Sequence, residues 1–303
     1  MHLTETLLLN YDQIVIYGAK GWVGRSAVEL LFNGNPNLIE NQILLIGSKT
    51  QSAHEAHFPF KVYSTSDAYG LLGKKIIFLN AAFIRREKLT GMTVLQYETA
   101  NQNIAQFGLN LINSGRVKTF VNLSSGVANQ GMIEDIEDVT DPYAKAKIIL
   151  ESLYATACNS IKSQLINCRI YSMSGKYINE FNNLALTSFL AQGMKEKHLI
   201  KVSSPSTLRS YVDSIDLVNV LFRLALQGSD FNLDSGGELI SLGDLAEVVC
   251  SVDENARVVY PEVFEKSPDY FGDYKIFNEF AKSLGVPLKN IKEQVLETSK
   301  ALL

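Results

Sequence analysis

Cysteine is scarce in this 303-residue sequence, and the few that occur argue against two kinds of structure. Cys158, Cys168 and Cys250 cannot all pair with one another, and their spacing matches no metal-binding motif. The N-terminal stretch also lacks the pattern of a signal peptide. We therefore expect a cytoplasmic protein with reduced thiols and no bound metal.

The sequence has no excess of positive charge and no long hydrophobic run. Lys and Arg number 28 against 32 Asp and Glu, which gives a net charge of −4. Domains that bind nucleic acid usually carry a basic surface, and this composition does not favour one. A membrane-spanning helix needs about 20 consecutive apolar residues, and no segment has them. We expect neither nucleic acid nor a membrane as a partner.

Short apolar runs alternate with helical patterns along the first half of the chain. Strands that are apolar throughout and separated by helices are typical of a parallel sheet covered on both faces. The predicted strands span residues 13–17, 42–46, 61–63, 75–80, 119–123 and 164–171, with helices near 93–113 and 143–157. The sequence therefore predicts an α/β fold, a doubly wound parallel sheet of the Rossmann type, with a smaller mixed α/β region at the C-terminal end.

A glycine-rich segment joins the first predicted strand to the first long helix. It reads Gly18-Ala19-Lys20-Gly21-Trp22-Val23-Gly24. Glycines at such a turn let the backbone N–H groups approach a pyrophosphate, and the N-terminus of the following helix adds a partial positive charge. We expect this segment to bind a dinucleotide through Gly18, Lys20, Gly21, Trp22, Val23 and Gly24; the alternative is a turn with a structural role only.

The end of the second predicted strand bears on the choice of dinucleotide. An NAD site usually has a carboxylate there for the 2′-hydroxyl of the ribose. Here the strand is followed by Ser48 and Lys49, which suit a 2′-phosphate better than a carboxylate would. We expect NADP as the cofactor, with NAD as the alternative.

The regular pattern of the first half changes after Gly175. A helix is expected over 183–193, among shorter elements of weaker periodicity. We predict that residues 1–175 form the dinucleotide-binding domain, with 210–235 returning to it. Residues 176–303 would then form mainly a substrate-binding region.

Tyr143 and Lys147 are four residues apart and would share one face of a helix. An adjacent ammonium favours the phenolate form of a tyrosine, so such a pair can exchange a proton with an alcohol or ketone. Ser124 and Ser125 end the preceding predicted strand, at the edge of the sheet where open α/β folds bind ligands. A hydroxyl there can polarise the same carbonyl group.

The sequence resembles the short-chain dehydrogenase/reductase superfamily, in its extended branch of NAD(P)-dependent epimerases and dehydratases that act on nucleotide sugars. The resemblance is carried by Gly18-x-x-Gly21-x-x-Gly24, Leu79-Asn80-Ala81-Ala82, Asn101, Ser124-Ser125, Tyr143-x-x-x-Lys147, the segment from Arg169 to Gly175, and the segment from Arg209 to Asp216. These motifs extend over most of the chain.

The resemblance implies roles for individual residues. Tyr143 would be the general acid and base, and Lys147 would bind the nicotinamide ribose and lower the pKa of the tyrosine. Ser125 would be the catalytic hydroxyl, with Ser124 as its substitute and as a substrate contact. Arg209 would approach the diphosphate of the substrate, whose oxygens suit a planar guanidinium. Three further residues are implied at the cofactor, namely Asn80, Ala81 and Ala82.

Departures from the family pattern bear on the reaction. Ser172 replaces an asparagine that the family places near the substrate. Gly126 and Val127 follow Ser125 where dehydratases commonly carry an acidic pair, and neither can move a proton. We therefore expect 4-keto reduction of a nucleotide-linked sugar, with C4 epimerisation on tightly bound NAD as the alternative.

Two other hypotheses use the same fold. One is a dinucleotide-binding sensor without activity, which would need no tyrosine, lysine and serine together. The other is a reductase of a carbonyl compound without a nucleotide, which would not need Arg209. The resemblance also implies a homodimer through the helices near 93–113 and 143–157.

Overall fold

The computed structural model describes residues 2–32, 42–54, 58–132, 135–178, 185–194, 198–252, 255–263 and 266–302. The chain divides into two compact units. The first consists of Met1–Arg169 and Val218–Leu233, and the second of Ile170–Leu217 and Asp234–Leu303. No helix among the described residues is long and apolar enough to cross a bilayer.

The first unit is built around a seven-stranded sheet in the order β10-β6-β5-β4-β1-β2-β3. Its strands are β1 (Gln13–Tyr17), β2 (Ile43–Gly47), β3 (Tyr63–Ser64), β4 (Ile76–Asn80), β5 (Val117–Ser125), β6 (Gln164–Ile170) and β10 (Phe231–Asp234). Strands β3, β2, β1, β4 and β5 pair in parallel. Because β1 lies inside the sheet, between β4 and β2, and the chain winds outward from it in both directions, the doubly wound Rossmann prediction is confirmed.

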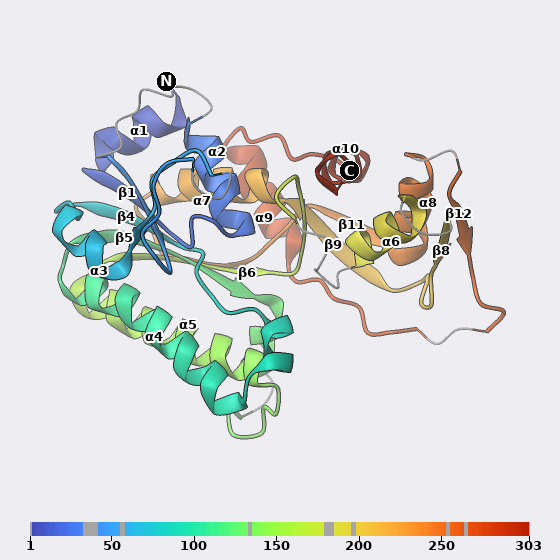
Figure 1. The fold of residues 1–303 in the computed structure, drawn as a ribbon, viewed down its shortest axis with the longest axis horizontal. Helices are drawn as coiled ribbons and strands as arrows, with labels where there is room; N and C mark the ends of the chain where they lie inside the picture. The colour runs from blue at the N-terminus through green and yellow to red at the C-terminus, as the bar shows by residue number, and fades with distance from the viewer. Residues whose placement is uncertain are drawn as a thin grey trace. The chain divides into compact units, whose positions relative to one another are not determined.

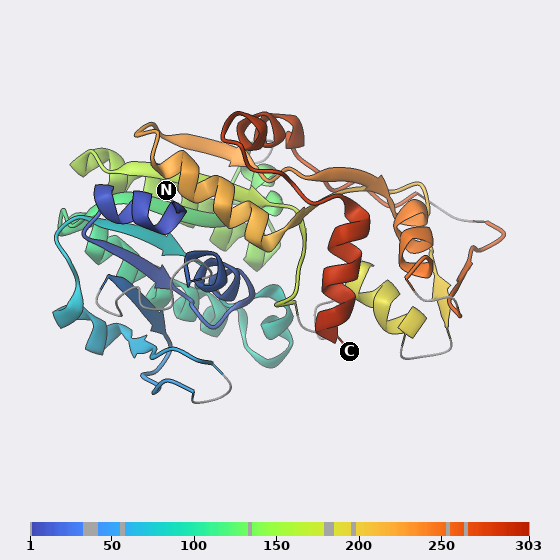
Figure 2. The same cartoon turned by 90° about the horizontal axis from the view of Figure 1, so that it is seen from above.

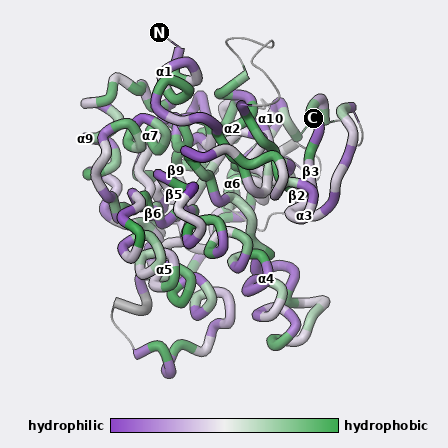
Figure 3. Tube along the Cα trace, turned by 90° about the vertical axis from the view of Figure 1, so that its left-hand side faces the viewer, coloured by the Kyte–Doolittle hydropathy of each residue, from purple (hydrophilic) through white to green (hydrophobic). Residues whose placement is uncertain are grey.

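Helices cover both faces of this sheet (Figures 1 and 2). On one face lie α1 (Leu3–Asn10), α2 (Trp22–Phe32) and α7 (Ser214–Ala225), of which the residues from Val218 on belong to this unit. On the other lie α4 (Val94–Asn113) and α5 (Pro142–Ile161). Figure 3 shows hydrophobic and hydrophilic residues alternating along α4, as expected of a helix with one face on a core. The short α3 (Thr65–Ala68) and the 3₁₀ helices η2 (Tyr69–Leu71), η3 (Arg86–Gly91) and η4 (Gly126–Met132) complete the unit.

Aromatic side chains fill the space between the sheet and α4 and α5. The rings of Phe78 and Phe120, on neighbouring strands, stack with centroids 5.3 Å apart. The ring of Phe120 lies 4.6 Å from that of Tyr154 on α5, and all three side chains are fully buried. This packing fixes α5 against β5 and so positions the residues at the N-terminal end of α5.

Four asparagines form a hydrogen-bonded ladder across four adjacent strands. The amide of Asn80 on β4 donates to Asn122 on β5 at 3.1 Å. Asn122 donates to Asn167 on β6 at 2.7 Å, and Asn167 donates to Asn232 on β10 at 2.9 Å. Since a buried amide is costly without partners, the ladder specifies which strands neighbour one another.

The described part of the second unit forms small sheets and helices. Strands β11 (Glu238–Ser241), β9 (Leu208–Asp213) and β7 (Ser172–Ser174) form one sheet in that order, and β12 (Arg257–Val259) pairs with β8 (Leu199–Lys201). The helices are α6 (Ala185–Met194), α8 (Leu242–Cys250), α9 (Tyr274–Ser283) and α10 (Ile291–Leu302). A buried apolar cluster of its own, including Leu190, Ile200, Tyr211, Leu245 and Val295, holds this unit together.

Some element boundaries differ from those predicted. Strand β5 continues to Ser125, so both serines lie within the strand rather than in a turn after it. Strand β3 comprises only Tyr63–Ser64 because Ser64 caps the next helix, its hydroxyl accepting from the backbone N–H of Asp67. The helix predicted over 183–193 corresponds to α6, and residues 183 and 184 lie outside the described residues.

Candidate active site

The glycine segment forms a turn in which the backbone approaches itself closely. Gly18 has a φ of +86°, and a Cβ there would lie 2.7 Å from the backbone of Ala81. A Cβ on Gly24 would lie 2.1 Å from the carbonyl oxygen of Gly18. Only glycine permits this packing of the first turn of α2 on the loop before it.

The same turn has the features that a pyrophosphate requires. Helix α2 begins at Trp22, and the first N–H groups of a helix have no partner within it. They point toward the carboxyl edge of the sheet, where the helix end also carries partial positive charge. Gly21 is exposed and Gly18 partly exposed, so their backbone is accessible, whereas Gly24 is buried where α2 packs on Gly18. These residues fit the diphosphate of a dinucleotide, and Val23 is buried beneath the turn.

The residues expected near the adenosine ribose lie at the ends of β1 and β2. Ser48 and Lys49 are exposed directly after β2. The ammonium of Lys20 donates to the side-chain oxygen of Gln51 in the same region. The sequence analysis did not identify Asp67, whose carboxylate accepts a hydrogen bond from Thr50 Oγ1; this bond holds the pKa of Asp67 below its usual value. A carboxylate and two lysines thus lie near the end of β2.

The loop after β4 leads to α4, and its first residues, Ala81 and Ala82, lie beside Gly18 of the glycine turn. The side chain of Asn80 is occupied within the sheet, donating to Asn122 and to the hydroxyl of Tyr154 at 3.3 Å. The backbone N–H of Ala81 donates to the carbonyl of Tyr17 at 2.9 Å. A ligand beside Gly18 would therefore meet the backbone of Ala81 and Ala82 rather than the Asn80 amide.

Ser124 and Ser125 are both buried at the end of β5. The hydroxyl of Ser124 has no hydrogen-bond partner among the residues that the structure describes. Because side chains alternate along a strand, Ser124 shares the face of Phe120, which packs against Tyr154 of α5. A buried hydroxyl without a partner is costly, and such groups call for a functional explanation.

Helix α5 starts immediately before Tyr143. Its N-cap is Asp141, whose side chain accepts from the backbone N–H of Tyr143 at 3.1 Å, and Pro142 occupies the first helical position. The same carboxylate pairs with Arg86 at 3.1 Å. This cap places Tyr143 in the first turn of α5.

Lys147 lies one turn further along α5, buried against the end of β5. Its ammonium donates to the carbonyl of Leu123 at 3.0 Å and lies 3.8 Å from the centroid of the Phe83 ring. Burial lowers the pKa of Lys147 to about 7, and the carboxylate of Glu151 opposes that effect. The ring of Phe83 also meets the ring of Tyr143 edge to face, at 5.6 Å. Phe83 thus contacts both members of the predicted pair.

The match to a protein-family model decides the family. The model of the NAD dependent epimerase/dehydratase family matches residues 14–234, which is most of the chain. The chain belongs to this family. No curated protein sequence matches it significantly.

Solved structures share the fold of this epimerase/dehydratase family member at low sequence identity. UDP-N-acetylglucosamine 4-epimerase from Bacillus cereus is 14% identical, with a TM-score of 0.69, over 95% of each chain. UDP-glucose 4-epimerase from Thermus thermophilus, in complex with NAD, is 14% identical with a TM-score of 0.68, over 95% of this chain and 98% of that one. TunA, described as an NAD dependent NDP-hexosamine 5,6-dehydratase, is 17% identical with a TM-score of 0.69, over 95% and 97%.

Two of the predicted substrate contacts belong to the second unit. Ser172 is buried in β7. Arg209 on β9 is half-buried; its Nη1 donates to the carbonyls of Leu208 at 3.0 Å and Pro268 at 2.9 Å, and its guanidinium lies 5.6 Å from the ring centroid of Tyr270. Burial lowers the pKa of Arg209. These contacts orient the guanidinium within its own unit.

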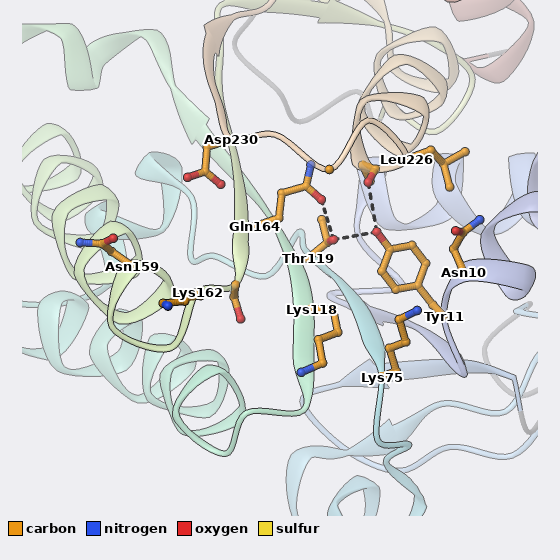
Figure 4. A pocket seen from close by; sticks show the side chains of 13 residues that line it. Asn10, Tyr11, Lys75, Lys118, Thr119, Asn159, Lys162, Gln164, Leu226 and Asp230 are labelled. Carbon is orange, nitrogen blue, oxygen red and sulfur yellow. Dashed lines mark hydrogen bonds between the residues drawn. The ribbon is translucent and has the colours of Figure 1, made fainter.

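A cavity of about 600 Å³ lies elsewhere in the first unit (Figure 4). It is lined at the amino ends of β1, β4 and β5 by residues such as Tyr11, Lys75 and Thr119. Tyr11 and Thr119 bond to each other at 2.7 Å, and Thr119 donates to Gln164 at 2.7 Å. Since β1, β4 and β5 are parallel, this cavity is at the opposite edge of the sheet from the glycine turn. Among the described residues there is also no cluster of side chains suited to a metal ion.

The loop after β4 is held by two side chains of α4, of which only Asn101 was expected from the sequence. Asn101 on α4 accepts from the backbone N–H of Ile84 at 2.8 Å, and the hydroxyl of Tyr97 donates to the carbonyl of Ile84 at 2.8 Å. Asn101 was singled out only by resemblance. Phe83 and Tyr97 belong to no sequence motif. Only their positions could have pointed to them: Phe83 lies three residues after β4, and Tyr97 lies in the first turn of α4.

Proposed function

We propose that the chain transfers hydride between a nicotinamide cofactor and C4 of a nucleotide-linked sugar, with Tyr143 as general acid and base. The observation that carries the proposal is the packing of Phe83 against both Tyr143 and Lys147, beside the end of β5 that bears Ser124 and Ser125. A phenol, an ammonium and two hydroxyls come from β5 and α5 of the same unit. The family and the nucleotide sugars named for its structural relatives support the substrate class.

In the direction of reduction, a nicotinamide cofactor held at the glycine turn would supply the hydride for the sugar carbon. The hydroxyl of Tyr143 donates its proton to the C4 oxygen as the carbonyl becomes an alcohol, which leaves a phenolate. The ammonium of Lys147, one turn away, stabilises that phenolate and binds the nicotinamide ribose. Ser125, or Ser124 in its place, donates a hydrogen bond to the same oxygen.

The remaining predicted contacts complete the proposal. The turn of Gly18, Gly21 and Gly24 would bind the cofactor diphosphate. Arg209 would contact the diphosphate of the substrate, and Ser172 would line the sugar site. Elimination of water is not proposed because Gly126 and Val127 carry no group that moves a proton.

We propose net 4-keto reduction with NADPH as the reaction. The absence of a carboxylate directly after β2 and the presence of Lys20 and Lys49 support NADP. C4 epimerisation on bound NAD is the second candidate. It is favoured by Asp67, which brings a carboxylate to this region, and by the NAD complex of the T. thermophilus epimerase.

A thermal-shift experiment separates the two cofactors. The purified chain is melted with NADPH, NADP⁺, NADH or NAD⁺, and then with UDP-, GDP-, dTDP- and CDP-linked sugars. A larger increase in Tm with NADPH than with NADH supports reduction with NADP, and the reverse order supports the epimerase. Tyr143→Phe should keep the cofactor-induced shift while it abolishes turnover of the sugar identified. Turnover retained in this variant contradicts the acid/base role.

We also propose a homodimer through α4 and α5. Val94, Leu95, Ile149 and Leu153 on these helices are large apolar side chains that are 41–73% exposed. Light scattering on the wild type should give twice the chain mass, and Leu153→Lys should give the mass of one chain. A monomeric wild type contradicts the dimer.

A further inference from the structure

Arg169 on β6 joins two segments of the first unit through one guanidinium. Its Nε lies 3.1 Å from each carboxylate oxygen of Glu151 on α5, and its Nη2 donates to one of them at 2.7 Å. Its Nη1 donates to the side-chain oxygen of Asn129 in η4 at 2.6 Å. The Arg169 and Glu151 side chains are only 12% and 13% exposed, so this ion pair is largely shielded from water.

Glu151 continues the row of residues that the proposed reaction uses. Tyr143, Lys147 and Glu151 are four residues apart in turn on α5, which places them along one face of the helix. The Lys147 ammonium lies against the Leu123 carbonyl of β5 and the Phe83 ring after β4, and on its own helix Tyr143 precedes it and Glu151 follows it by one turn. The charged group among them is the Glu151 carboxylate, which favours the protonated lysine against the effect of burial.

Asn129 extends the connection to the serines. It lies in η4, which begins at Gly126, directly after Ser125. Arg169 therefore links the segment that follows the two serines to the helix that carries Tyr143 and Lys147. One of these segments follows the proposed serines and the other carries the proposed tyrosine and lysine, and the same guanidinium binds both.

A shielded ion pair is a poor way to gain stability alone. Apolar side chains of similar volume often stabilise a core as well or better, whereas removal of one partner leaves an uncompensated charge. The geometry indicates a role for this ion pair other than stability, because Glu151 is one helical turn from the buried ammonium of Lys147.

We propose that Glu151 and Arg169 are positioning residues: Glu151 keeps Lys147 in its ammonium form, and Arg169 holds the Glu151 carboxylate in place and ties η4 to α5. The inference rests on the proposed function of Lys147 beside Tyr143. It concerns the charge state of one lysine, which is measurable without substrate or cofactor.

The test is an NMR titration of the lysine side chains in the intact protein. Lysines are labelled with ¹³C at Cε, and the Lys147 signal is identified by its loss in Lys147→Gln. Three variants are compared with the wild type: Glu151→Gln, Arg169→Gln, and the double variant. All three exchange a charged side chain for a glutamine that retains hydrogen-bonding groups.

The two single variants should shift the titration midpoint of Lys147 in opposite directions. Glu151→Gln removes the negative neighbour and leaves Arg169, so the midpoint should fall by about one pH unit or more. Arg169→Gln leaves Glu151 unneutralised, so the midpoint should rise. The midpoint of the double variant should lie between those of Glu151→Gln and the wild type, because Glu151, one turn from Lys147 on the same helix, acts on it more strongly than Arg169 does.

A pair that does not act on Lys147 would leave its midpoint at the wild-type value in all three variants. Asp12→Asn is the matched control, since Asp12 precedes β1 at the other edge of the sheet, and it should leave the midpoint unchanged. If a single variant does not fold, the double variant alone decides: a midpoint equal to that of the wild type overturns the proposal. Shifts of the same sign in both single variants also overturn it.

The outcome is distinguishable from failure of the proposed function. A protein that shows the opposite shifts but transfers no hydride refutes the reaction and leaves the charge relationship intact. A protein in which Tyr143→Phe abolishes turnover, but Glu151→Gln leaves Lys147 unmoved, refutes only the positioning roles.

Discussion

The ammonium of Lys147 lies 3.8 Å from the centroid of the Phe83 ring, in a position where it is buried at the end of β5. A cation over an aromatic face is stabilised by the ring quadrupole, and the Leu123 carbonyl adds a hydrogen bond of 3.0 Å. These contacts do not fully replace water, and burial lowers the pKa of Lys147 to about 7.

The depressed pKa of Lys147 makes stability depend on pH. The unfolded chain has a lysine of ordinary pKa near 10.5, so between about pH 7 and 10 it binds more protons than the folded chain. The free energy of unfolding should therefore rise with pH in this window, by about 3–5 kcal/mol in total from this residue. Urea unfolding at pH 7, 8 and 9 measures the slope.

Lys147→Met should flatten that slope, because the group responsible has been removed. Lys145→Met, on the same helix but partly exposed, is the matched control and should keep it. A slope that survives in Lys147→Met would show that another group is responsible.

The close contact between Gly24 and Gly18 predicts a position that tolerates no side chain. Gly24→Ala puts a Cβ 2.1 Å from a backbone oxygen, so the turn or helix α2 must move. We expect a loss of about 1–3 kcal/mol in the free energy of unfolding and a weaker thermal shift with dinucleotides. Gly70→Ala is the control, since a Cβ there meets nothing within 4 Å and should change stability by less than about 0.5 kcal/mol. Equal effects of the two substitutions would refute this account of the turn.

The buried asparagines of the ladder should contribute more to the free energy of unfolding than the asparagine at its exposed end. Asn122→Leu removes the acceptor of Asn80 and the donor to Asn167, and each buried group left without a partner costs about 1–3 kcal/mol. Asn232→Ala removes only the exposed end and should cost less than about 1 kcal/mol. Chemical denaturation compares the two directly. A smaller loss for Asn122→Leu than for Asn232→Ala would mean that the ladder does not stabilise the sheet.

The parallel sheet could be predicted because its strands are buried on both faces. The run Gln13–Tyr17 is apolar apart from its first residue, and the structure assigns β1 to those five residues, all buried. The short strands of the second unit were harder to predict. Strands of three or four residues, as in β7 and β11, show too little periodicity to be identified from the sequence. Their pairing depends on segments that are far apart in the sequence, such as β7 with β9.

Some residues of the candidate site could be predicted from local sequence patterns, and others could not. Glycines, a tyrosine with a lysine four residues later and paired serines are local patterns, so they could be found in the sequence. Phe83 and Arg169 act through contacts with α5, which no local pattern reveals. The asparagine ladder was equally hidden, because its members come from four strands.

Transfer of deuterium from the cofactor tests the central claim most directly. The wild type and Tyr143→Phe are incubated with NADPH or NADH carrying deuterium at the nicotinamide C4, together with 4-keto nucleotide sugars, and the product is analysed by NMR. The account predicts deuterium at C4 of the sugar with the wild type and none with Tyr143→Phe, although the variant still binds the cofactor. Deuterium transfer at the wild-type rate in Tyr143→Phe, or none by the folded wild type with any nucleotide sugar and either cofactor, would contradict it.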